Sequence, residues 1–171
     1  MVKYRTYCKK APKNKVRIKK LKGSQFTKPV GGLWGCRGDE WIDWCRQEEF
    51  CLDKWKECFE WELTKDAKVL RVRSVSGFTN LIKKYYKNVA PGLGEVDFLQ
   101  IAKEYDAIEL TEVPVTNLHF GYRTFQVPIE DFFSDRGKMV LYKFGTYSWD
   151  VPSICVFNAD KIKVIRSWKV K

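Results

Sequence analysis

The sequence predicts an α+β fold, in which a few short helices are kept apart from mostly antiparallel strands. Residues near the N-terminus and over 58–63 alternate with the period of a strand. Apolar residues have helical spacing between residues 76 and 105, and the C-terminal part is again strand-like. This order of strands, one helix, strands, two short helices and strands favours helices segregated from the sheet. With 171 residues, 44% of them apolar, we expect a single domain over residues 1–171.

The first part of the chain predicts two strands and a helix. Residues 4–7 and 16–19 each alternate between a packed face and a charged face, so both are expected to be strands. A helix is expected after Gly38, with Asp39 as its N-cap, because apolar residues then recur on one face. That face carries Trp41, Ile42 and Cys45.

Further strands are expected along the rest of the chain. Residues 58–63 (CFEWEL) place Phe59, Trp61 and Leu63 on one side, as a half-buried strand would. Residues 67–74 are interpreted as the hairpin partner or neighbour of that strand. The remaining strands are expected at residues 106–110, 138–144, 153–158 and 161–168.

Two short helices are expected in the middle of the chain. The first begins near Ser76 and the second near Asp97, and each turns apolar residues inward at helical spacing. Residues 88–94 contain a proline and two glycines, so a loop is expected between the helices. Residues 113–136 mix apolar and turn residues and are interpreted as a long loop.

Positive charge is concentrated at the start of the chain. The first 38 residues hold twelve Lys or Arg and no acidic residue, whereas residues 39–171 hold twenty basic and twenty-one acidic residues. The net charge of +11 therefore arises from this N-terminal part. Such a surface attracts polyanions, so a nucleic acid or a phosphate-bearing ligand is the expected partner of residues 1–38. The alternative is a solvated basic face without a ligand.

The six cysteines favour free thiols over a metal site. No Cys-x-x-Cys pair occurs and His119 is the only histidine, so a structural zinc site is not expected. The N-terminus lacks an apolar signal core and no run of eighteen apolar residues occurs. We therefore expect a cytoplasmic protein without a membrane span, and we expect several of the thiols to lie in its core.

The stretch GGLWGC, residues 31–36, places glycines on both sides of a large aromatic residue. Glycine permits backbone angles that other residues avoid, and it also permits close approach of another chain or molecule. The sequence therefore predicts either an unusual turn or a binding surface around Trp34.

Three segments together resemble the ADP-ribosyltransferase fold. SICVFNADKIK (153–163) is similar to the closing strand-turn-strand of that family, and YDAI (105–108) resembles the strand preceding it in several bacterial and phage members. GGLWGC and the Trp-rich segment after it resemble a strand and helix of the poly(ADP-ribose) polymerase branch. The three segments occur in the family's order, and the resemblance covers roughly residues 30–165.

The resemblance implies an NAD site between two small, mostly antiparallel sheets that form a split core. Trp34 would stack on the nicotinamide ring, and Gly31, Gly32 and Gly35 would let the dinucleotide lie close to the backbone. Arg5 would hold the adenosine ribose, as in the arginine-type branch of the family. The alternatives are that Trp34 only fills the core and that Arg5 is a phosphate contact or a surface charge.

The expected catalytic acid is missing from its position. The resemblance places a Glu at the start of the closing strand, where this chain has Ser153. Asp150 and Glu109 are two carboxylates that could take its place, and with Ser153 they form the candidate catalytic set. Glu109 should face away from Ile108 and Leu110, toward a cleft or toward water. A carboxylate is needed because breaking the glycosidic bond of NAD develops positive charge on the ribose.

Three functions are consistent with the sequence. The favoured one is an NAD-dependent mono-ADP-ribosyltransferase acting on a macromolecular acceptor, with nucleic acid as one candidate. The second is a non-catalytic protein of the same fold that binds NAD or another nucleotide. The third is a basic nucleic-acid-binding protein whose aromatic residues stack on bases.

Overall fold

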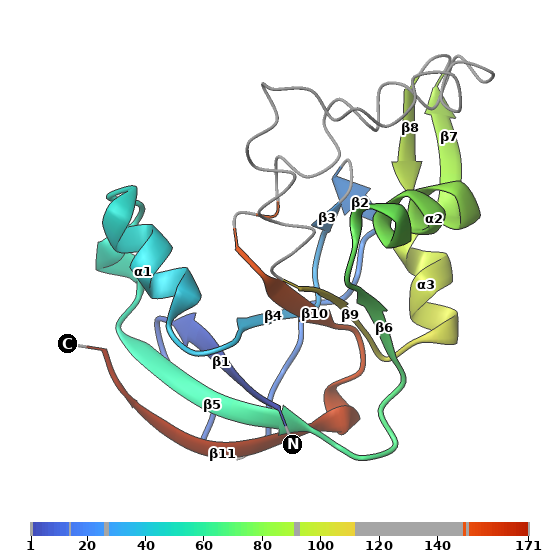
Figure 1. Ribbon diagram of the computed structural model, residues 1–171. Coiled ribbons are helices and arrows are strands. Elements are labelled where there is room, and N and C mark those ends of the chain that lie inside the picture. Colours follow the sequence, from blue (N-terminus) through green and yellow to red (C-terminus); the bar gives the residue numbers. More distant parts are fainter. Residues whose placement is uncertain are drawn as a thin grey trace.

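The computed structural model describes residues 2–13, 15–25, 28–90, 93–111, 149 and 151–170, and it has the α+β class that the sequence predicts (Figure 1). The helices are α1 Glu40–Gln47, α2 Val75–Tyr85 and α3 Phe98–Glu104, with short 3-10 helices η1 Leu52–Lys54 and η2 Ala159–Lys161. The strands are β1 Lys3–Cys8, β2 Ser24–Gln25, β3 Lys28–Pro29, β4 Leu33–Cys36, β5 Glu57–Leu63, β6 Val69–Val72, β7 Tyr86–Ala90, β8 Leu93–Val96, β9 Ala107–Leu110, β10 Ser153–Val156 and β11 Ile162–Lys169.

One large mixed sheet organises the described residues. Its seven strands have the order β11-β5-β1-β4-β10-β9-β6, and two-stranded ribbons of β2–β3 and β7–β8 stand apart from it. Every pair in the sheet is antiparallel except β6 with β9, which are parallel. The structure thus has a single seven-stranded sheet where the family resemblance implied two small ones.

The sheet is nevertheless almost divided between β1 and β4. These two strands share one residue pair, Arg5 with Cys36, whereas β1 and β5 share six pairs and β4 and β10 share four. The Thr6 hydroxyl crosses this junction, because it donates to the Trp34 carbonyl oxygen at 2.6 Å and accepts from Trp61 Nε1 at 2.9 Å. The two parts of the sheet therefore separate at the β1–β4 junction, where one residue pair and the hydrogen bonds of the Thr6 hydroxyl connect them.

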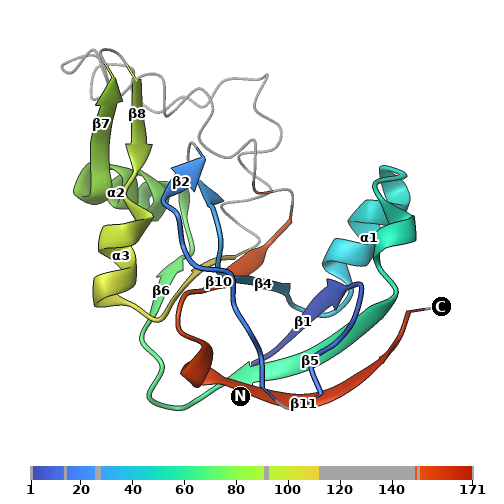
Figure 2. The ribbon, with the colours of Figure 1, turned by 180° about the vertical axis from the view of Figure 1, so that it is seen from behind.

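Alternation along the strands builds cores on both faces of the sheet. One face carries Tyr4, Trp61 and Ile154 in a single apolar cluster, and the ring of Tyr4 stacks on Trp61 at 4.9 Å. The other face carries two separate clusters, one under α2 and α3 and one under α1. In Figures 1 and 2, α1 lies near β1 and β5, whereas α2 and α3 lie near β6 at the far edge.

Local sequence explains where the helices begin. The Ser74 hydroxyl accepts from the Gly77 N–H and the Asp97 carboxylate accepts from the Gln100 N–H, so both α2 and α3 have side-chain N-caps. Asp39 occupies the N-cap position of α1 but makes no capping hydrogen bond. None of the described helices has the length and apolar character needed to cross a membrane.

Three local expectations are wrong. Residues 16–19 form no strand; Val16 and Ile18 pack on the core, but only Lys19 makes an isolated bridge, to Gly32. β6 pairs with β9 instead of β5, because a register between distant strands is not encoded by local alternation. The expected loop at 88–94 falls within the β7–β8 ribbon. The expected loop at 113–136 and strand at 138–144 lie outside the described residues.

We expect Thr6→Val to weaken the junction between the two parts of the sheet. The substitution keeps the shape of the side chain but leaves the buried Trp61 N–H without its acceptor. The free energy of unfolding should fall by about 1–3 kcal/mol, measured by urea denaturation. Thr6→Ser retains the hydroxyl and should lose less; equal losses in the two variants would contradict a role for the hydrogen bonds.

Candidate functional site

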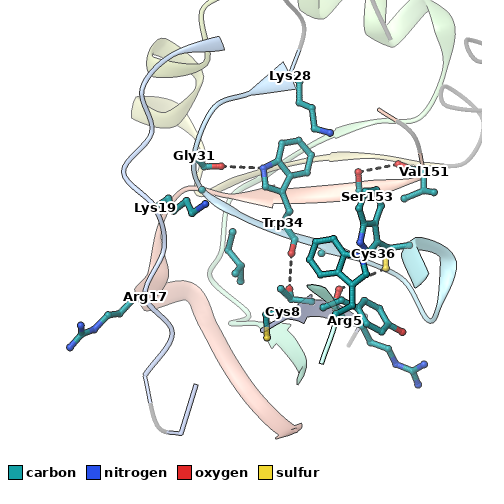
Figure 3. A pocket seen from close by; sticks show the side chains of 17 residues that line it. Arg5, Cys8, Arg17, Lys19, Lys28, Gly31, Trp34, Cys36, Val151 and Ser153 are labelled. Atoms are coloured by element: carbon teal, nitrogen blue, oxygen red, sulfur yellow. Dashed lines mark hydrogen bonds between the residues drawn. The ribbon is translucent and has the colours of Figure 1, made fainter. Parts of the chain in front are cut away.

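A cleft opens where β1 and β4 separate, and we call it the β1–β4 cleft (Figure 3). Its volume is about 510 Å³. Residues 5–8 of β1 and residues 31–36, which lead into and form β4, make its walls, and Ser153 at the start of β10 also lines it. The remaining lining residues are Arg17, Lys19, Lys28, Trp41, Trp55 and Val151. The cleft therefore combines Arg5, Trp34 and Ser153, which come from three distant parts of the sequence.

Trp34 is a half-buried wall of this cleft. Its indole N–H donates to the Gly31 carbonyl oxygen at 3.1 Å, which fixes the orientation of the ring. The ring meets that of Trp149 edge-on at 4.9 Å, and the Lys28 ammonium lies 4.9 Å from its centroid. Figure 3 shows Lys28 reaching toward the ring from above it. Trp34 thus both packs on the core and lines the cleft, so the two sequence alternatives are not exclusive.

Arg5 is held by carboxylates on its own side of the sheet. Its guanidinium lies 2.6 Å from Asp39 Oδ1 and 3.5 Å from Glu60 Oε2, and it sits 5.3 Å from the Trp168 ring. The Tyr7 hydroxyl also donates to Asp39. These hydrogen bonds, that of Tyr7 first and that of Arg5 second, lower the pKa of Asp39 below its usual value. Asp39 is therefore an anchor for Arg5, which explains why it does not cap α1.

The three predicted glycines have structural explanations within the chain. Gly31 and Gly32 have φ of +113° and +70°, which are left-handed values that favour glycine. A Cβ on Gly31 would lie 2.4 Å from the Lys20 carbonyl oxygen, and one on Gly32 would lie 2.5 Å from Cys155 Sγ. A Cβ on Gly35 would lie 2.6 Å from the Trp61 ring. The unusual turn is therefore confirmed, and the atoms that approach the three glycines closely belong to the protein itself and not to another molecule.

Ser153 joins the cleft to a second hollow of about 250 Å³, which we call the Ser153 hollow. The Ser153 hydroxyl donates to the Val151 carbonyl oxygen at 3.0 Å. Glu40 and Glu109 supply the carboxylates that line the hollow, together with Tyr4, Arg37 and Thr111. Asp150, the third candidate catalytic residue, lies outside the described residues.

Glu109 is buried and fully engaged. Only 2% of it is exposed, so it does not face water, although it does point away from Ile108 and Leu110 as expected. Its Oε1 accepts from Arg37 Nη2 at 2.6 Å and from the Tyr4 hydroxyl at 3.0 Å, and its Oε2 accepts from Arg71 Nε at 3.0 Å. Burial, and then the charge of Glu109, raise the pKa of Tyr4 to about 12. This geometry holds two arginines in place and does not aim the carboxylate into the β1–β4 cleft.

Basic side chains give the cleft a positive rim. Arg17, Lys19 and Lys28 line it, and no lining residue in the described part of the chain is acidic, whereas the charge of Arg5 is balanced by Asp39 and Glu60. Arg17 points away from Trp34 in Figure 3, whereas Lys28 points toward it. An anionic group at the mouth would therefore meet cations on more than one side.

Several of these residues could not be found by sequence reasoning. Arg71 lies opposite Glu109 only because β6 pairs with β9 in parallel. Arg37 and Glu40 follow β4 closely, so their proximity to Ser153 depends on the β4–β10 pairing. The one available signal was the run of basic residues in the N-terminal part, which does contribute to the cleft.

The cysteines offer no obvious nucleophile or metal site in the described part of the chain. All six are free and four are buried, in agreement with the expected free thiols in the core. Cys36 lines the cleft, but burial raises its pKa to about 12, so its thiol stays protonated at neutral pH. The described residues contain no group of three or more side chains able to hold a metal ion.

Comparison with protein-family models, with curated proteins and with solved structures finds no match to this chain. The resemblance to ADP-ribosyltransferases therefore rests on the three sequence motifs alone.

Gly32→Ala should be far more damaging than Gly38→Ala. Both glycines have left-handed φ, +70° and +59°, so alanine costs about 1–2 kcal/mol at either position. Only at Gly32 would the new methyl group meet protein atoms, whereas the space beside Gly38 is open. The free energy of unfolding should therefore fall by about 1–3 kcal/mol more in Gly32→Ala. Equal losses in chemical denaturation would contradict the packing explanation.

Glu109→Gln should destabilise the protein. The change leaves Arg37 and Arg71 without their buried counter-charge, although these arginines are 49% and 39% exposed and water moderates the loss. We expect a decrease of about 2–4 kcal/mol in the free energy of unfolding. Asp43→Asn, which removes an exposed ion pair with Arg46, should cost less than about 1 kcal/mol. A Glu109→Gln protein of wild-type stability would contradict the assigned anchoring role.

Proposed function

We propose that the β1–β4 cleft binds NAD and that the protein transfers ADP-ribose from it to a macromolecular acceptor. The observation that carries the proposal is the meeting of Arg5, Trp34 and Ser153 around one cleft. These are the positions that the family resemblance assigns to ribose binding, nicotinamide stacking and the catalytic acid. Their sequence separation makes this meeting a property of the fold and not of local sequence.

The cleft has the size and lining that a dinucleotide requires. Small-molecule sites commonly measure about 300–1,000 Å³ and combine aromatic walls with a few polar groups. The indole of Trp34 offers a flat surface for the nicotinamide ring, and Lys28 would turn from that ring toward the ligand phosphates. Arg17 and Lys19 would extend the positive surface for the pyrophosphate.

The chemistry needs a carboxylate close to Ser153. In the transfer, the bond between ribose C1′ and the nicotinamide nitrogen breaks, and nicotinamide leaves as the neutral base. A bond forms from C1′ to an acceptor oxygen or nitrogen, whose proton passes to a carboxylate or to water. Glu109 is occupied by Arg37, Arg71 and Tyr4, so we assign this role to Glu40 in the Ser153 hollow or to Asp150.

A second candidate is a non-catalytic protein that binds NAD or another nucleotide in the same cleft. The observation in its favour is the lack of an acidic residue among the described residues that line the β1–β4 cleft itself. Binding would then use the same aromatic and basic groups, but no group would stabilise the developing oxocarbenium charge. The two candidates differ in one measurable product, free nicotinamide.

The decisive test is to incubate the purified protein with NAD and measure the thermal shift and the release of nicotinamide. Trp34→Leu should weaken NAD binding by at least about tenfold, because loss of one stacking contact costs about 1–3 kcal/mol. Trp34→Phe keeps an aromatic face and should bind more tightly than Trp34→Leu. Phe50→Leu changes an aromatic residue outside the cleft and should bind NAD as the wild type does.

The outcomes separate the candidates. Nicotinamide release that is lost in Glu40→Gln or Asp150→Asn would support transferase chemistry and identify the acid. A thermal shift without release would support the non-catalytic binder. If the folded protein shows no thermal shift with NAD and releases no nicotinamide, this result would contradict NAD as the ligand.

A further inference from the structure

The segment between β1 and the β2–β3 ribbon carries a dense and unbalanced positive charge. Residues 9–22, which we call the basic tract, contain eight Lys or Arg and no acidic residue. The cations of the tract are all exposed: Lys9, Lys10, Lys13, Lys15, Arg17, Lys19, Lys20 and Lys22. Lys15 pairs with Asp160 at 3.1 Å, and the other seven have no ion-pair partner within the described part of the chain.

Elsewhere in the described protein, cations are either paired with a carboxylate or scattered singly along the chain. Arg5, Arg37 and Arg71 each lie against a carboxylate, and so do Lys84, Lys161 and Arg166. Lys65, Lys83 and Lys103 also lack an ion pair within the described part of the chain, but they lie far apart in the sequence, whereas the tract holds seven such cations within fourteen residues. Outside the tract, the remaining 24 Lys or Arg face 21 Asp or Glu, a balance of only +3. Keeping like charges together costs free energy, which an anionic partner would recover.

The basic tract is pinned to the protein, so its charges have a defined path. Val16 is buried, Ile18 packs on the core, and Lys19 pairs with Gly32 through the backbone at 2.8 Å. The Lys22 N–H donates to the Val30 carbonyl oxygen at 2.8 Å. In Figure 2 the segment crosses the sheet from the β11 edge toward β2. The cations thus form a track across the sheet and not a free tail.

This track leads into the β1–β4 cleft. Arg17 and Lys19 belong both to the tract and to the lining of the cleft, where Trp34, Trp41 and Trp55 also lie. Val16 and Ile18 anchor the tract on the face of Tyr4 and Trp61, whereas the three Trp rings pack on the clusters of the opposite face, so cations and rings meet at the cleft. Cations that contact phosphates, combined with rings that stack on unpaired bases, bind single strands. An acidic protein segment would use the cations but would leave the rings without a role.

We propose that the basic tract binds single-stranded nucleic acid and guides it to the mouth of the β1–β4 cleft. The binding stands independently of catalysis. That the bound strand is also the acceptor of ADP-ribose rests on the proposed transferase function. In that case a base or terminal group of the strand would attack ribose C1′ as described above.

The test is fluorescence anisotropy with labelled single-stranded RNA and DNA of about 20 nucleotides, longer than the roughly 4–16 nucleotides that a single-strand domain commonly covers. The tract variant replaces Lys9, Lys10, Lys20 and Lys22 with Gln and leaves every cleft residue intact. Its matched control replaces four other exposed lysines with Gln: Lys65, Lys83, Lys103 and Lys169. Both variants therefore lose four positive charges.

The tract variant should bind the strand at least about tenfold more weakly than the control variant at equal salt. Each lost phosphate contact lowers the slope of log affinity against log salt by about 0.7, so the slope should become shallower by up to about 3. Equal losses in the two variants would overturn the proposal, because bulk charge alone would then explain binding. Labelled polyglutamate that binds as tightly as the strands would overturn it in favour of an acidic protein partner.

NAD measurements on the same variants separate this proposal from the preceding one. The tract variant should keep the NAD thermal shift of the wild type, since Arg17, Lys19 and Lys28 are unchanged. Strand binding without any response to NAD would leave the tract proposal standing and remove the transferase. If a folded tract variant loses both its response to NAD and its strand binding, this result would overturn the proposal that the tract is a binding surface separate from the NAD site.

Discussion

The hydroxyl group of Thr6 holds together the two parts of the sheet on which the site depends. β1 and β4 share one residue pair, so the polar links at this junction come largely from side chains. A tighter ladder between the strands would close the β1–β4 cleft, and a complete break would separate Arg5 from Trp34. The cleft is therefore a consequence of incomplete strand pairing, made tolerable because the hydroxyl bonds both a carbonyl and an indole N–H.

Electrostatics divide the molecule into a balanced interior and an unbalanced surface. Glu109 is costly to bury alone, and Arg37, Arg71 and Tyr4 offset that cost by hydrogen-bonding both of its oxygens. Asp39 balances the charge of Arg5 beside the cleft in a similar way, through an ion pair. These pairs fix side chains but leave little net charge, so the field around the protein comes mainly from the basic tract. The ion-paired residues that fix side chains around the site are therefore different from the cations of the basic tract that attract a polyanion.

Sequence reasoning succeeded where local pattern decides structure. The alternation in residues 58–63 predicted β5, and the helical spacing after Ser76 and Asp97 predicted α2 and α3. It failed where distant pairing decides, because neither the parallel β6–β9 pair nor the burial of Glu109 is visible in either segment alone. The motifs also singled out Trp34, which lines the β1–β4 cleft, but they gave no sign of the two arginines that contact Glu109.

The glycines around Trp34 show how packing and function are connected in this chain. Gly32 lets β4 approach Cys155 of β10, and Gly35 lets it approach Trp61 of β5. Because these positions carry no side chain, this segment can lie close to Cys155 and to the Trp61 ring while Trp34 remains its bulky cleft-lining residue. A larger residue at either position would push β4 away and displace the indole ring. The same glycines that allow this close packing therefore determine where the Trp34 ring lies in the cleft.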